Sequence, residues 1–166
     1  MEYDARLIAN IVLDEAESQG HPLSNLALQK VMFFCHAWHL VDTGKPLIKH
    51  EFEAWQHGPV LQFIYRQFKE SESRPIRTRA KKLNPLNGRH EVAQGEIDSS
   101  TRARIRKVVG FYGRLEPWDL VDLSHVEGGP WHSVWNNAQR VNPGMKISHN
   151  AIREFYSSAM EGRPIQ

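Results

Sequence analysis

The chain has 166 residues, of which 40% are hydrophobic and 24% charged, and its formal net charge is +2. This balance predicts one globular domain whose core needs no disulfide or metal, and it excludes disordered, collagen-like and repeat architectures. No apolar run is long enough to cross a bilayer, no secretory signal is recognisable, and Cys35 is the only cysteine. We therefore expect a cytoplasmic protein without an internal disulfide or a membrane partner.

The first two predicted elements are helices. Apolar residues recur at helical spacing from Asp4 to about Ser18, and Gly20 and Pro22 are expected to end that helix. From Asn25 to Val41, apolar side chains surround nearly the whole circumference. A helix of this kind is typical of the interior of a fold.

The buried helix carries the first candidate reactive groups. Cys35 lies among aromatic residues, and an apolar environment raises the pKa of a thiol, so we interpret it as an inert core residue. His36 and His39 stand three residues apart and can share a helix face. A zinc site needs three or four ligands, however, and the usual paired spacings are missing. We expect no metal and interpret both histidines as buried hydrogen-bonding residues, the alternative being a zinc site completed by a distant histidine.

A short strand is predicted next, because polar and apolar residues alternate over residues 51–55. Gly58-Pro59 is expected to start another helix, since proline fits the first helical position. The expected inner face of that helix is Leu61, Ile64, Tyr65 and Phe68. Glu51 and Glu53 could act as paired carboxylates, but we interpret them as a solvated strand face.

The stretch from Arg74 to Lys107 holds ten basic and three acidic residues, so it carries +7 while the remainder of the chain carries −5. Asn87-Gly88 predicts a hairpin turn between residues 81–83 and 90–92. Asp98 or Ser99 is expected to cap a basic helix that follows. Three interpretations of the charge stay open: a solvated surface, a site for an acidic protein, or a nucleic-acid surface, although no Phe, Tyr or Trp is present to stack on bases.

The last third predicts three helices: one from Glu116 to about His125, one opened by Pro130, and one capped by Ser148. The chain has five tryptophans, and we expect most of them in the core and one or two exposed at a partner surface. The fold class is therefore mainly α, a single compact helical domain over residues 1–166 with a small central β element.

No motif predicts an enzyme. The chain has no phosphate-binding or dinucleotide-binding glycine loop. Ser124 and His125 are adjacent, and neighbours on a helix point about 100° apart, so they do not form a nucleophile and base by themselves. We expect no catalytic residue and no cofactor.

Four stretches of the chain share one pattern: residues 28–40, residues 43–47, residues 53–60 followed by Tyr65, and residues 123–135. Together they resemble the Panacea domain, also called the SocA-like antitoxin domain. Their order and spacing across residues 28–135 carry the resemblance, whereas the basic stretch shows no family pattern. Ser124 stands where the family usually has threonine. The residues that match the family pattern are Gln29, Lys30, Trp38, His39, Glu53, Trp55, Gly58, Pro59, Tyr65, His125, Pro130, Trp131 and Trp135.

The resemblance implies an antitoxin of a bacterial or phage-borne toxin–antitoxin system that binds its cognate toxin directly. It also implies, for one branch of the family, an adaptor that delivers the toxin to the ClpXP protease. We interpret the motif residues as scaffold or as members of a partner groove. Because similar domains pair with unrelated toxins, we expect the toxin to be selected by a basic surface outside the motifs. That predicted surface consists of Arg77, Arg79, Lys81, Lys82, Arg102 and Arg106.

The alternative function is a nucleic-acid-binding regulator that uses the basic helix over residues 99–113. No helix-turn-helix pattern supports it.

Overall fold

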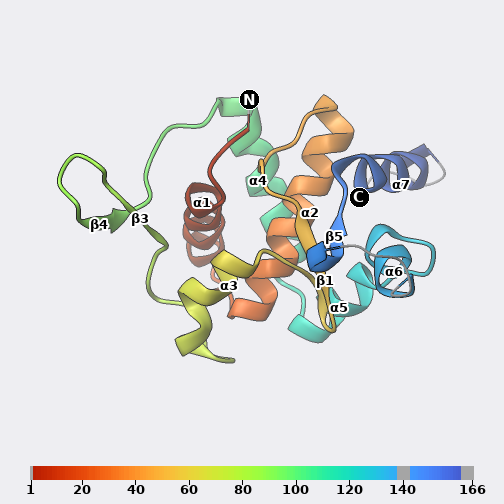
Figure 1. The fold of residues 1–166 in the computed structure, drawn as a ribbon, viewed down its shortest axis with the longest axis horizontal. Coiled ribbons are helices and arrows are strands. Elements are labelled where there is room, and N and C mark those ends of the chain that lie inside the picture. The colour runs from red at the N-terminus through yellow and green to blue at the C-terminus, as the bar shows by residue number, and fades with distance from the viewer. Residues whose placement is uncertain (1, 138–142, 162–166) are drawn as a thin grey trace.

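A computed structural model describes residues 2–137 and 143–161, in which seven α-helices pack together with a small three-stranded sheet, and a separate two-stranded hairpin projects from one side (Figure 1). The prediction of a mainly α fold is confirmed. The helices are α1 (Ala5–Ser18), α2 (Asn25–Thr43), α3 (Gln62–Phe68), α4 (Ser99–Tyr112), α5 (Pro117–Ser124), α6 (Pro130–Trp135) and α7 (His149–Glu161). The strands are β1 (Phe52–Trp55), β2 (Gly58–Val60), β3 (Lys81–Leu83), β4 (His90–Val92) and β5 (Lys146–Ile147), and short 3-10 turns cover Lys69–Ser71 and Pro143–Met145.

Helix α2 lies at the centre of the molecule and contacts α1, α4, α5 and α7 (Figure 1). It begins after Ser24, whose Oγ accepts a hydrogen bond from the Ala27 amide, and it ends at Gly44 in the left-handed conformation. Its side chains join one hydrophobic core that also takes residues from all the other long helices. The prediction of a buried helix is confirmed, and so is the burial of Cys35, which raises the pKa of the thiol.

The predictions for the remaining helices other than α3 hold closely. Asp4 caps α1 and Asp98 caps α4, each by accepting a hydrogen bond from a backbone amide of the first turn. Helix α5 lies within the predicted segment, Pro130 is the first residue of α6, and Ser148 Oγ accepts from the Ala151 amide at the start of α7. Within the described part of the chain no helix is long and apolar enough to cross a membrane.

The prediction that Gly58-Pro59 starts a helix is wrong. Residues 58–60 form strand β2, which pairs antiparallel with β1 so that Ala54 lies opposite Pro59. Strand β2 is at the edge of the sheet, whose order is β2-β1-β5, and an edge strand tolerates a proline that cannot donate a backbone hydrogen bond. Helix α3 follows from Gln62. Tyr65, expected on the inner face of that helix, is 37% exposed.

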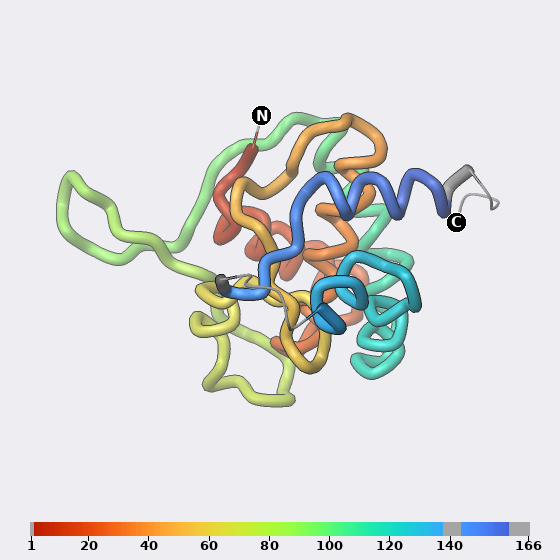
Figure 2. The backbone as a smooth tube through the Cα atoms, turned by 45° about the vertical axis from the view of Figure 1, so that its right-hand side comes forward, coloured from red at the N-terminus to blue at the C-terminus, as the bar shows by residue number. Residues whose placement is uncertain are grey.

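The predicted hairpin is confirmed. Strands β3 and β4 pair antiparallel, with Lys82 opposite Glu91 and Leu83 opposite His90. Gly88 in the connecting turn has a φ of 71°, a conformation that glycine adopts without strain. Figure 2 shows that this hairpin stands away from the helical body, on the side opposite α5 and α6. We call residues 81–92 the hairpin arm.

Candidate functional site

The family-pattern residues converge on Lys30, a lysine that is fully buried on α2. Its Nζ donates a hydrogen bond to the carbonyl oxygen of Pro59 at 2.8 Å. Burial away from water lowers the pKa of Lys30 to about 7. An ammonium in this place would lie in a low-dielectric interior without a carboxylate partner among the described residues, so the neutral amine is favoured.

Gly58 makes this arrangement possible. Its φ is 111°, and a Cβ at this position would lie 2.5 Å from Lys30 Cε and 2.6 Å from Ser124 Oγ. Any side chain would therefore collide with α2 and α5 at once. The hydroxyl of Ser124 donates to the Val121 carbonyl at 2.8 Å, so it is already satisfied within its own helix.

Gln29, the neighbour of Lys30, connects α2 to the turn between β2 and α3. Its Oε1 accepts a hydrogen bond from the Leu61 amide at 3.0 Å, and its Nε2 donates to Asn25 Oδ1 at 3.1 Å. Asn25 in turn donates to the Tyr65 carbonyl at 3.0 Å. These hydrogen bonds satisfy polar groups that are buried away from water. We therefore interpret this series of contacts as part of the scaffold.

The aromatic residues of the family pattern extend the same cluster toward α6. Trp131 Nε1 donates to the Trp55 carbonyl at 2.8 Å, and Trp55 Nε1 donates to Glu53 Oε1 at 2.9 Å. The Trp131 ring stacks on His125 at 3.6 Å between centroids and on Trp135 at 5.6 Å. Burial, followed by the nearby Lys30, lowers the pKa of His125. We call Gln29, Lys30, Gly58, Ser124, His125 and Trp131 the motif cluster.

Trp38 and His39 lie elsewhere, about two turns further along α2. Trp38 Nε1 donates to the Tyr112 hydroxyl at 2.9 Å. His39 Nδ1 lies 3.1 Å from an Arg104 nitrogen, and Arg104 Nε donates to Asp42 at 2.7 Å. Burial, with Arg104 as the next cause, lowers the pKa of His39 to about 4. These two residues therefore connect α2 to α4 through side-chain contacts and are not part of the motif cluster.

The predicted basic surface does not form one continuous patch. Arg79 donates to Asp14 at 2.8 Å and to Glu17 at 2.7 Å, and Arg77 lies 3.9 Å from Glu17. Arg106 pairs with Glu15 at 3.4 Å, so α1 neutralises much of the positive charge. The residues of the set that make none of the ion pairs within residues 2–137 and 143–161 are Lys81, Lys82 and Arg102.

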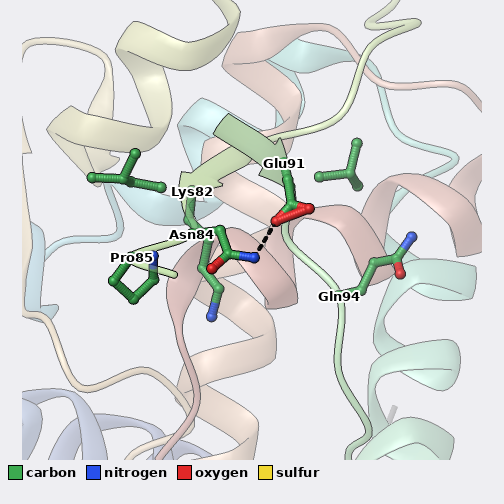
Figure 3. Close-up of a pocket in the computed structure, with 7 residues that line it drawn as sticks. Lys82, Asn84, Pro85, Glu91 and Gln94 are labelled. Atoms are coloured by element: carbon green, nitrogen blue, oxygen red, sulfur yellow. Dashed lines mark hydrogen bonds between the residues drawn. The ribbon is translucent and has the colours of Figure 1, made fainter. Parts of the chain in front are cut away.

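The hairpin arm has a hollow of about 450 Å³ on one side (Figure 3). Lys82, Leu83, Pro85 and Val92 contribute to its lining, and Asn84 Nδ2 donates to Glu91 Oε1 across it. The described residues contain no group of three or more His, Cys, Asp or Glu side chains that could hold a metal. The hollow thus combines apolar groups with amides, one lysine and one carboxylate, and it offers a mixed polar and apolar surface for contact with another molecule.

The expectation of one or two exposed tryptophans is met by Trp118 and Trp135, but sequence reasoning did not single out Trp118. Its side chain is 58% exposed on α5, and its ring lies 5.1 Å from that of His57 in the turn between β1 and β2. The available signal was its spacing from Asp122, one helical turn further on, which places both on the outer face of the predicted helix.

Comparison with known proteins gives one consistent result. The family model described as "Antitoxin SocA-like, Panacea domain" matches residues 28–132. The chain is similar to Antitoxin SocA of Caulobacter vibrioides (strain NA1000 / CB15N), with 38% identity over 154 residues that cover 92% of this chain and 82% of that protein. No solved structure matches the chain significantly.

Proposed function

This chain belongs to the Antitoxin SocA-like, Panacea domain family, and from that membership we propose that it neutralises a cognate toxin in the cytoplasm by binding the toxin directly. Its role is that of an antitoxin, and its partner is a toxin protein. The observation that carries the proposal is the 38% identity to Antitoxin SocA over nearly the whole chain. A binding role needs no catalytic group.

The hairpin arm is the part of the chain best suited to select the toxin. Lys81 and Lys82 project from β3, and the apolar side chains of Leu83, Leu86 and Val92 are exposed beside them. Charge on an accessible arm speeds encounter with an oppositely charged partner and disfavours wrong partners, while exposed apolar groups supply contact area. We therefore expect an acidic toxin face with apolar residues at its centre.

Two modes of neutralisation fit such a complex. In the first and favoured mode the antitoxin sequesters the toxin. In the second it acts as an adaptor for ClpXP, which requires a further surface for the protease. Helices α5 and α6 lie on the other side of the molecule from the hairpin arm (Figure 1). Their exposed side chains Trp118 and Trp135 supply a candidate for that further surface.

The test begins with the protein encoded beside this chain, expressed under tight control in a bacterium with and without the antitoxin. Growth arrest that the antitoxin relieves, together with co-purification of the two proteins, is the expected result. Relief that disappears in a host without ClpXP, with no stable complex, favours delivery. A harmless neighbour, or arrest that the antitoxin never relieves, contradicts the proposal.

Nucleic-acid binding through α4 is the weaker candidate. Arg104 and Arg106 on that helix are held by Asp42 and Glu15, which leaves fewer cations for phosphate contacts. A mobility shift of duplex DNA that weakens steeply with salt would revive it.

A further inference from the structure

A second surface, at the other side of the molecule from the hairpin arm, exposes large apolar side chains of a different kind. We call this set the aromatic surface. Single exposed apolar residues are common on proteins and need no explanation, but a connected group of them marks an interaction site. The members are Trp118, Leu123, Val126 and Trp135, which lie on α5, on α6 or on the segment that joins these two helices.

Ring contacts join each of the two tryptophans of this set to the body of the fold. Trp131, whose indole N–H donates to the Trp55 carbonyl, belongs to the motif cluster. Trp131 stacks on Trp135. Trp118 contacts His57 in the turn that joins β1 to β2. Helices α5 and α6, which carry these tryptophans, lie together at one end of the fold, away from the hairpin arm (Figures 1 and 2).

The aromatic surface is also acidic. Residues 115–137 contain four acidic residues and neither lysine nor arginine. These residues, Glu116, Asp119, Asp122 and Glu127, are exposed and make none of the ion pairs seen among the described residues. On α5, Asp122 follows Trp118 by four positions and Leu123 follows Asp119 by four, so acidic and apolar side chains alternate on neighbouring stripes of one helix.

We propose that the aromatic surface docks a segment of a second protein partner that carries arginine or lysine beside apolar residues. Carboxylates attract such a segment, the indole faces of Trp118 and Trp135 accept its cations, and Leu123 and Val126 contact its apolar side chains. The hairpin arm has the opposite charge and lies on the opposite side of the body. The inference rests on the toxin-binding role proposed for that arm, and with it the chain would offer two docking sites of opposite charge.

The test measures fluorescence polarisation of two labelled 12-residue peptides, one alternating arginine with leucine and the other alternating glutamate with leucine. The aromatic surface of the wild-type protein is expected to bind the arginine peptide at least tenfold more tightly than it binds the glutamate peptide. Trp118→Ala and the double variant Asp119→Lys, Asp122→Lys are each expected to weaken that binding at least tenfold. Leu123→Ala provides a second apolar variant with a smaller change in volume.

Control variants change exposed side chains elsewhere on the molecule. Glu70→Lys and Leu86→Ala are expected to leave binding of the arginine peptide within twofold of wild type, as is Lys81→Glu with Lys82→Glu in the hairpin arm. Circular dichroism melting confirms that each variant is folded.

Two results would overturn the proposal. One is binding of the arginine peptide that stays within twofold of wild type in both Trp118→Ala and the α5 double variant. The other is self-association that depends on protein concentration and is abolished both by the α5 variants and by the arm variants. That result would show that the aromatic surface binds the hairpin arm of a second copy.

Discussion

The motif cluster and the hairpin arm use polar residues in opposite ways. In the motif cluster, Lys30 and Gln29 are buried, and their side chains form hydrogen bonds with the backbone of residues 59–61. In the hairpin arm, Lys81 and Lys82 are exposed to solvent. The comparison teaches that the recognisable motifs of this family describe how the scaffold is assembled, while the exposed side chains that we propose for toxin recognition lie where no motif is seen.

The largest loss of stability is expected when a methyl group is placed in the motif cluster. Gly58→Ala is expected to cost more than about 3 kcal/mol of unfolding free energy, because the new Cβ meets Lys30 and Ser124 and the φ of 111° strains any side chain. Gly20→Ala is the matched control, since Gly20 has a φ of 80° but nothing within 4 Å. Its expected cost is about 1 kcal/mol. Equal costs in urea unfolding would contradict the tight packing described for Gly58.

Lys30 provides a prediction about pH. Its pKa is about 7 in the folded chain against 10.5 for an unperturbed lysine, so between those values the unfolded chain binds a proton that the folded chain does not. Stability is therefore expected to rise from pH 7 to pH 10, by an amount on the order of a few kcal/mol, and the cost of the buried charge is fully present below pH 7. Lys30→Met should remove this part of the pH dependence. Parallel stability curves for the two proteins would show that Lys30 is charged or hydrated in the fold.

A smaller difference is expected between two of the basic residues in how much each contributes to stability. Arg79 bridges Asp14 and Glu17, and its side chain is only 18% exposed, so Arg79→Glu is expected to cost about 1 kcal/mol of stability. Lys82→Glu, on the exposed arm, is expected to stay within about 0.5 kcal/mol of wild type. Thermal melts at low and high salt measure both. A loss in Lys82→Glu as large as that in Arg79→Glu would mean that the arm belongs to the scaffold.

Much of the fold was predictable because its signals are local. Helical periodicity and capping residues such as Asp98 located the helices, and Asn87-Gly88 located the hairpin turn with its register. Gly58-Pro59 misled because glycine and proline permit a helix start as well as an edge strand. The choice is made by contacts with Lys30 and Ser124, which are remote in sequence.

The surfaces were less predictable, for the same reason. The charge of the stretch from Arg74 to Lys107 is visible in the sequence, but the pairing of Arg79 with Asp14 spans 65 positions and appears only when α1 packs beside it. Likewise, nothing local joins Trp118 to His57 or Tyr65 to Trp55. Local patterns thus identify elements, whereas a docking surface is a property of how distant elements meet.

The central claim is that this antitoxin binds its toxin through the hairpin arm, and calorimetric titration of purified toxin into the antitoxin tests it most directly. The variant carrying Lys81→Glu, Lys82→Glu and Arg89→Glu reverses the charge of the arm while leaving Arg77 and Arg79 against α1. We predict at least a tenfold loss of affinity in this variant, a strong dependence of wild-type affinity on salt, and unchanged toxin binding in Trp118→Ala. Wild-type affinity in the arm variant, or no binding by the wild-type chain, would contradict the account.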